Sequence, residues 1–176
     1  MAIQYWDDVL YPPFRATIRG EYYGIISERE MDEECYNLVL RAVATFKYPR
    51  ISTEYVTFYA IRTNENQLQE VSVSELNDYP DATLHGYFVN ELTFAELQVL
   101  IAWMKVYWAE YQISNADNFE DMYTDANIKT FSRANAVEKN RALMAEYRSY
   151  ARDLENRYSR SNNCKTTVGE INSDNE

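Results

Sequence analysis

One helix in the middle of the chain constrains the fold more than any other segment. Thr93 and Glu96 have the spacing of a capping box, in which two side chains satisfy free backbone N–H groups at a helix start. An apolar stripe then recurs at steps of three and four residues: Phe94, Leu97, Leu100, Ile101, Met104, Trp108 and Tyr111. The stripe is widened by Val99, Trp103 and Tyr107. A helix that is apolar around so much of its circumference is buried on several sides, so we expect it at the centre of the core.

A second capping box, Ser27 with Glu30, begins an earlier helix that Pro49 ends. One face of this helix is apolar and carries Met31, Cys35, Leu38, Val39, Ala42, Val43 and Phe46. Its first turns are rich in carboxylates: Glu28, Glu30, Asp32, Glu33 and Glu34. Clustered carboxylates can bind metal or perform acid–base chemistry, but negative charge also stabilises the positive end of a helix dipole. The dipole is the explanation that we favour.

A third, long helix is expected from Arg133 to Tyr158, with Ser132 as its cap. Residues at alternating steps of three and four, most of them apolar, form a heptad-like seam: Val137, Asn140, Met144, Tyr147, Ala151, Leu154 and Tyr158. Because Asn140 and Ala151 interrupt the seam, we expect the helix to pack along its own domain, with its far end projecting. The chain after residue 160 is polar and lacks periodicity, so we expect 161–176 to be disordered.

The remaining segments complete the expected domain organisation. Tyr55–Ile61 is β-branched and aromatic, and Leu68–Val73 follows a polar turn, which predicts a β-hairpin at about 54–73. Residues 1–26 scatter aromatic side chains among prolines and glycines, and such an arm either folds over its own domain or grips a neighbour. We therefore expect a mainly α fold: an aromatic-rich arm (1–26), a small helical domain (27–160) with a β-hairpin insertion and a long C-terminal helix, and a disordered tail (161–176).

Charge is distributed unevenly along the chain. The net charge of −11 argues against ordinary nucleic-acid binding, which depends on Lys and Arg to neutralise phosphates. Residues 129–160 nevertheless carry eight basic and four acidic side chains, whereas residues 1–128 carry eight basic and twenty-one acidic ones. A basic helix on an acidic body is consistent with head-to-tail attraction between subunits or partners, and equally with a solvated helix face.

The sequence contains no pattern typical of a catalytic, metal or cofactor site. The four glycines are scattered and form no phosphate-binding loop, and His85 is the only histidine. A lone histidine beside a glycine is most often a turn or interface residue. A disulfide between Cys35 and Cys164 would require the polar tail to dock. No apolar run approaches the roughly 20 residues that span a bilayer, and the N-terminus lacks a secretory pattern, so we expect no membrane association.

The segment from Gly86 to Gln112 resembles a pattern that recurs in head-to-tail connector proteins of tailed bacteriophages. An aromatic pair, a short acidic link, Leu-Thr and an acidic helix start precede an apolar helix that holds Met and Trp. The matching residues are Tyr87, Phe88, Leu92, Thr93, Glu96, Met104, Trp108 and Gln112. The resemblance continues through Phe131 and Ser132 to a long helix that ends in Tyr-Ser-Arg at 158–160. The chain is similar in particular to neck ring proteins of crAss-like phages. This resemblance covers roughly the second half of the chain plus the first helix.

This resemblance implies a non-enzymatic structural subunit of a homo-oligomeric ring, a dodecamer, in the neck of the virion. Such a portal adaptor assembles in the host cytoplasm and joins the portal protein to further neck or tail proteins. It also extends the channel through which double-stranded DNA passes without sequence readout. The charge asymmetry and the impure heptad indicate subunit or portal contacts near the far end of the long helix, at Arg148, Arg152, Arg157, Tyr158 and Arg160.

Two other classes of function compete with this reading. A small acidic cytoplasmic regulator could bind a protein partner, for example as a DNA mimic that inhibits a nucleic-acid enzyme. A mimic needs one continuous negative face, however, which the basic helix interrupts. An enzyme that uses Asp and Glu alone is the third possibility, and only the abundance of carboxylates favours it.

Overall fold

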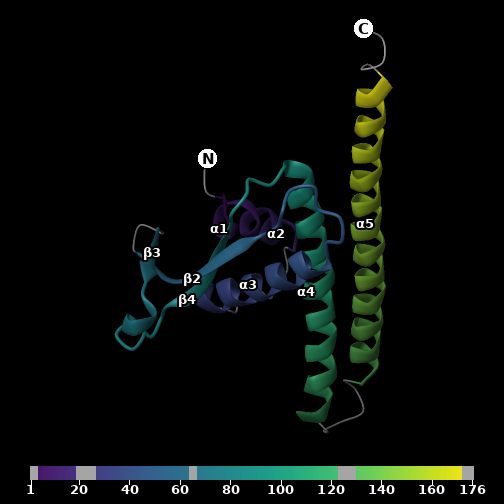
Figure 1. The fold of residues 1–176 in the computed structure, drawn as a ribbon. Coiled ribbons are helices and arrows are strands. Elements are labelled where there is room, and N and C mark those ends of the chain that lie inside the picture. Colours follow the sequence, from purple (N-terminus) through teal and green to yellow (C-terminus); the bar gives the residue numbers. More distant parts are fainter. Residues whose placement is uncertain (1–3, 19–26, 64–66, 123–129, 172–176) are drawn as a thin grey trace.

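The structure is a computed structural model that describes residues 4–18, 27–63, 67–122 and 130–171 (Figure 1). Side chains are described within these ranges except at 115–122, 130–137 and 162–171. The elements in chain order are β1 (Gln4–Tyr5), α1 (Trp6–Val9), α2 (Tyr11–Thr17), α3 (Glu28–Thr45), β2 (Tyr55–Arg62), β3 (Leu68–Val71), the 3-10 turn η2 (Val73–Glu75), β4 (Thr83–Phe88), α4 (Phe94–Met122) and α5 (Thr130–Ile171).

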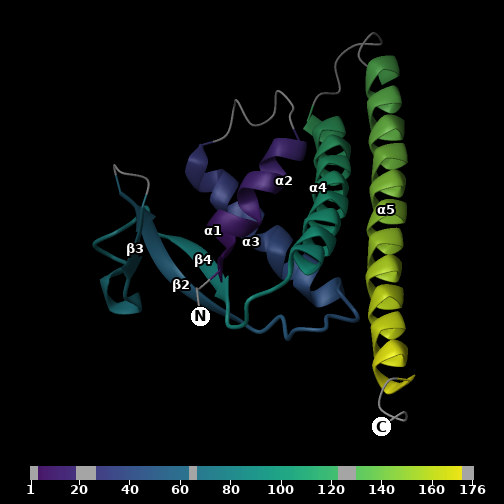
Figure 2. The same cartoon turned by 90° about the horizontal axis from the view of Figure 1, so that it is seen from above.

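The strands form one four-stranded antiparallel sheet in the order β1-β4-β2-β3. Figure 2 shows the layers that follow it across the molecule: the sheet, then helices α1–α3, then α4, and finally α5. The core joins the N-terminal helices, α3, the end of β4, α4 and one face of α5.

The expectation of a mainly α fold with a β-hairpin insertion is wrong, because the chain has a mixed α/β fold. The predicted hairpin is present as β2 and β3, but β2 also pairs along its other edge with β4. His85 does not lie in the turn or interface that we expected for a lone histidine beside a glycine. Thr83–Phe88 instead forms the second central strand, and β1 was missed because two residues are too short for any periodicity.

The aromatic arm folds over its own domain. Its described part, residues 4–18, contributes β1, α1 and α2, and these elements bury Trp6, Leu10, Tyr11, Phe14 and Ile18 in the core. The steps of three and four between these residues are helical, although the helices are short and Pro12 and Pro13 lie at the start of α2. Residues 19–26 of the predicted arm lie outside the described residues.

Both predicted capping boxes are confirmed, and α4 is central to the core as expected. The Ser27 hydroxyl accepts from the Glu30 N–H while the Glu30 carboxylate accepts from the Ser27 N–H, and Thr93 with Glu96 repeats the arrangement. The fully buried side chains of α4 include Val99, Leu100, Met104 and Val106. A helix buried on this scale sits between α3 on one side and α5 on the other.

Helix α5 packs antiparallel to α4 along the predicted seam, and its C-terminal end runs past the start of α4 (Figure 1). The buried residues of α5 are Ala151, Glu155 and Tyr158, and Met144, Tyr147 and Leu154 pack against the core. Helix α4 continues to Met122, and α5 exceeds its predicted bounds at both ends, since it spans Thr130–Ile171. Part of the segment expected to be a disordered tail is therefore helical, and residues 172–176 lie outside the description.

Gly86 is required by the packing of the sheet against α1. A Cβ atom at this position would lie 2.8 Å from the Trp6 ring, which is closer than non-bonded carbon atoms approach. We predict that Gly86→Ala lowers the free energy of unfolding by about 1–3 kcal/mol, because the buried indole cannot move away without displacing the core. Urea unfolding followed by tryptophan fluorescence measures this loss. Gln69→Ala, at an exposed position of β3, is the control and should change stability by less than about 0.5 kcal/mol. Equal stability of the two variants would contradict the prediction.

Candidate functional site

Glu96 joins three separate parts of the chain. One carboxylate oxygen accepts hydrogen bonds from the Arg50 and Ile51 N–H groups, at 3.1 and 2.9 Å, and from the Tyr158 hydroxyl, at 2.7 Å. The other oxygen accepts from the N–H and hydroxyl of Thr93, at 2.8 and 2.7 Å. Burial alone would raise the pKa of Glu96, but these hydrogen bonds outweigh it and lower that pKa. The ionised carboxylate is thus the form that the fold holds.

The other residues of the connector-like pattern also serve the fold. Phe88, Leu92 and Met104 are buried in the core, and Trp108 packs against it. Tyr87 lies on β4 and contacts the Tyr5 ring edge to face, with ring centroids 5.7 Å apart. The pattern therefore marks the junction of β4, α4 and α5, and none of these side chains forms a reactive site.

The predicted contact residues on α5 divide into two groups. Tyr158 is only 9% exposed, and its hydroxyl also accepts a hydrogen bond from the Arg50 N–H, so it serves the fold and not an exposed surface. Arg152, Arg157 and Arg160 are exposed and Arg148 is half-buried. Arg157 forms an ion pair with Asp153 one turn away, at 2.6 Å. The structure does not bring the five residues together as one site.

A basic surface nevertheless runs along α5. Arg141, Arg148 and Arg152 lie seven and four residues apart, so at 3.6 residues per turn they share one helix face. Within the described part of the chain, none of these three guanidinium groups forms an ion pair. A shallow groove on this face is lined by Met144, Ala145, Arg148, Ser149, Arg152, Asp153 and Asn156, and Asp153 is paired with Arg157. We call Arg141, Arg148 and Arg152 the arginine face; the sequence argument missed Arg141 because it considered only the far end of the helix.

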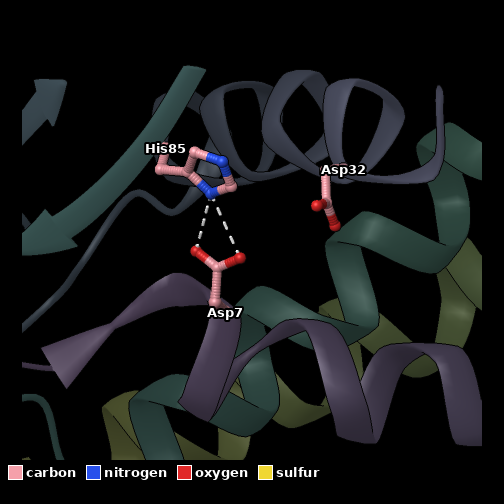
Figure 3. A group of neighbouring side chains, drawn as sticks. All are labelled: Asp7, Asp32 and His85. Atoms are coloured by element: carbon pink, nitrogen blue, oxygen red, sulfur yellow. Dashed lines mark hydrogen bonds and ion pairs between the residues drawn. The ribbon is translucent and has the colours of Figure 1, made fainter. Parts of the chain in front are cut away.

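A buried polar network under the sheet was not predicted. The Arg62 guanidinium bridges Asp7 and Asp32, each at 2.7 Å, and Arg15 binds the other Asp32 oxygen at 2.5 Å. The Nδ1 atom of His85 lies 3.0 Å from Asp7 (Figure 3). Asp32, which we assigned to the helix dipole, is therefore a buried ion-pair partner. No sequence spacing could indicate this, because the five residues come from five distant segments.

The grouping of Asp7, Asp32 and His85 is geometrically suitable for a metal ion, since one ligand atom from each lies within 4.8 Å of the others. Both carboxylates, however, already bind guanidinium groups. A cation at this position would lie beside Arg15 and Arg62, whose charges neutralise the two aspartates. We therefore assign no metal to this group.

The same histidine also has the neighbours of a catalytic triad. Its Nε2 atom lies 2.8 Å from the Thr83 hydroxyl, while Nδ1 faces Asp7. His85 is fully buried and Thr83 is 6% exposed, and neither lines the groove over the sheet to which Asp7 contributes. A substrate therefore has no path to the hydroxyl through that groove, and we interpret the trio as a hydrogen-bonded core histidine.

The groove over the sheet has a volume of about 780 Å³ and is bordered by β1, β2, β3 and α1. Its aromatic wall consists of Tyr5, Phe58 and Tyr87, which already pack against one another. Asp7 and Arg62 in its floor bind each other. Since Asp7, Arg62 and the three aromatic rings already have partners within the fold, we assign no ligand to this groove.

A second groove of about 370 Å³ lies between α3 and α4 and is rich in carboxylates. It is lined by Glu30, Glu33, Glu34, Asn37, Leu38, Arg41, Tyr107 and Tyr111. We call it the glutamate groove. Its one arginine, Arg41, binds Glu110 at 2.5 Å and lies over the Tyr107 ring at 4.1 Å from the ring centre. Three glutamates thus face a single guanidinium that another carboxylate already neutralises.

Glu34 is the unusual residue of the glutamate groove. One of its carboxylate oxygens is buried and has no hydrogen-bond partner among the described residues. By contrast, Glu33 pairs with Arg29 at 3.1 Å and Glu30 belongs to the capping box. Burial raises the pKa of Glu34 to about 7. The ionised form of Glu34 is therefore destabilised in the isolated chain.

Comparisons with protein-family models, curated proteins and solved structures find no match to this chain. No helix in the described ranges has both the length and the apolar character needed to cross a bilayer. Cys35 is buried and forms no disulfide, and burial raises the pKa of its thiol to about 12. The side chain of Cys164, its suggested disulfide partner, lies outside the described residues.

Replacement of Glu96 tests its role as the junction. We predict that Glu96→Gln lowers the free energy of unfolding at pH 7 by about 2–3 kcal/mol, because an amide nitrogen cannot accept the hydrogen bonds that one carboxylate oxygen accepts. The lowered pKa of Glu96 adds stability above the unfolded value of 4.5, and this contribution is lost as the pH falls through the folded value. The deficit of the variant should therefore shrink in acid. Urea unfolding at pH 7 and pH 3 measures the loss of stability and its change with pH, with the exposed Glu91→Gln as control. A loss that is the same at both pH values would refute the role of the ionised carboxylate.

Replacement of Glu34 should have the opposite sign. Because the pKa of Glu34 is raised from 4.5 to about 7, the ionised carboxylate costs stability progressively over that interval and fully above it. We predict that Glu34→Gln is more stable than the native chain by about 1 kcal/mol at pH 8, a value that is reduced because the group is partly exposed. At pH 4.5 the variant and the native chain should be equally stable. Urea unfolding at the two pH values tests this. Glu33→Gln is the matched control and should show no pH-dependent gain; the same gain for both variants would contradict the prediction.

Proposed function

We propose that this chain is a non-enzymatic structural subunit of a phage neck ring, which joins the portal vertex to the tail and extends the DNA channel. The observation that carries the proposal is the arginine face of α5, whose guanidinium groups have no ion-pair partner within the described chain. A row of such groups, two exposed and one half-buried, on an otherwise acidic protein is suited to contact another protein. The resemblance of residues 86–112 to connector proteins supports the same proposal.

The charge of the rest of the molecule is compatible with a DNA channel. Lys and Arg that contact phosphates displace counterions and hold DNA in place. A wall dominated by Asp and Glu does not bind the backbone, so DNA can pass along it. We therefore propose that the acidic body, and not the arginine face, borders the channel, and that the DNA is not read by sequence.

The partners that we propose are further copies of the chain in a dodecameric ring, the portal protein, and other neck or tail proteins. The ring would be located at the portal vertex of the virion after assembly in the host cytoplasm. Arg148 and Arg152 on α5, with Arg160 further along, are the proposed contacts for these proteins. The regulator or DNA mimic is an alternative outcome of the test. The arginine face argues against the mimic, because it interrupts the continuous negative surface that a mimic needs.

Gentle purification of the tagged chain from its native setting tests the proposal. We expect the protein to sediment in a large particle together with portal and tail proteins, which mass spectrometry identifies. The triple variant Arg148→Gln, Arg152→Gln and Arg160→Gln should leave the particle and sediment as free protein, because it lacks the proposed contact charges. Lys139→Gln, on a different face of α5, is the matched control and should remain in the particle.

Two results would contradict the proposal. If the triple variant remained in the particle, the arginines would not be contacts. If the native chain were recovered with a host enzyme and without virion proteins, the neck role would be wrong and the regulator would be favoured.

A further inference from the structure

We propose that α5 of one copy docks in the glutamate groove of the neighbouring copy, so that its arginine face meets the three glutamates between α3 and α4. The proposal rests on the ring function above and names the two surfaces that join its subunits. It commits the glutamate groove to a second copy of this chain.

The two surfaces are complementary in charge. The arginine face consists of Arg141, Arg148 and Arg152, and they have no ion-pair partner in the described chain. The lining of the glutamate groove has three carboxylates and one guanidinium, and Glu110 neutralises that guanidinium. Because Arg29 pairs with Glu33, the carboxylates of the groove that form no ion pair among the described residues are Glu30 and Glu34, and these are the charges that the arginine face can compensate.

The spacing of the charges also agrees. Arg148 and Arg152 are separated by one helical turn on α5, and Glu30 and Glu34 are separated by one turn on α3. One turn corresponds to about 6 Å along either helix axis. When α5 lies alongside α3 of a neighbour, two arginine–glutamate pairs can therefore form at the same time.

Glu34 is the acceptor in the groove that lacks a hydrogen-bond donor. Its buried oxygen lacks a hydrogen bond within the described chain, and an unmet buried acceptor is costly. An arginine from a neighbour would supply both the missing hydrogen bond and the missing positive charge. Tyr111 borders the same groove and is 45% exposed, so its ring is accessible to a guanidinium, whereas the Tyr107 ring is already covered by Arg41.

The placement of the surfaces favours a ring. The N-terminal half of α3 and the helix α5 lie on opposite sides of α4 in both views (Figures 1 and 2). The arginine face of one copy therefore cannot reach its own groove, but it can reach that of the next copy. An interaction between two different surfaces of identical subunits propagates head to tail and closes into a ring when the rotation permits.

Charge reversal and its rescue test the interface. Sedimentation equilibrium of the purified full chain, up to roughly 1 mM, measures self-association in the range of weak interfaces. We expect Arg152→Glu and Glu34→Arg each to weaken association at least about tenfold, because like charges then face each other. The chain that carries both changes should return to within about threefold of the native value, since the pair is restored with opposite polarity.

Three controls separate the interface from folding. Lys139→Glu makes the same charge change on a different face of α5 and should leave association unchanged. Glu34→Gln weakens association although it stabilises the fold at neutral pH, so it serves if Glu34→Arg does not fold. Raising the salt concentration should weaken association of the native chain, because partly exposed ion pairs are screened.

The interface is refuted if the native chain remains monomeric at the highest concentration, or if the double reversal does not restore association. It is also refuted if Lys139→Glu weakens association as much as Arg152→Glu does. The neck role fails separately, through recovery from the native setting without virion proteins. If the chain is found in virions but the charge reversals do not change its self-association, the proposed function stands and this interface is refuted. If the chain is absent from virions but the double reversal restores self-association, the interface stands and the neck role is refuted.

Discussion

The carboxylate of Glu96 is the constraint on which the rest of the structure depends. It lies at the start of α4, yet it accepts hydrogen bonds from the Arg50 and Ile51 N–H groups and from Tyr158 on α5. The packing of the C-terminal helix on the body is thereby tied to a single buried ionised group. Such a group is stable only when each of its acceptor positions is used, so the three segments are fixed relative to one another.

The sequence predicts well those elements whose signals are local. Both capping boxes and the apolar stripe of α4 were identified, because their residues lie within one or two turns of each other. Of the sheet, only the β2–β3 hairpin was identified; β4 was missed because Pro80 precedes it and His85 and Gly86 lie within it, and β1 was missed because it has only two residues. A strand of this kind is stabilised by its neighbours, and those neighbours are distant in the sequence.

The site shows the same division. The excess of basic residues near the C-terminus singled out Arg148 and Arg152 of the arginine face on α5, but it missed Arg141. The hydrogen bond of Tyr158 to Glu96 could not be predicted, because the two residues are 62 positions apart. The sequence likewise could not predict the ion pairs that Arg62 forms with Asp7 and Asp32, or the burial that destabilises the ionised form of Glu34. In each case the chemistry of one residue is decided by a segment to which no spacing rule connects it.

The pairing of β1 with β4 has a consequence for synthesis. Gln4 lies opposite Phe88, so the first strand has no partner until the ribosome has released the whole of β4. Until then Trp6, which the finished protein buries completely, can meet Tyr36 of α3 but lacks Phe88 of β4, so its burial stays incomplete. A segment that is synthesised before β4 therefore reaches its final place only after β4 is available, and during that interval its incompletely buried apolar side chains are accessible to chaperones and prone to aggregation.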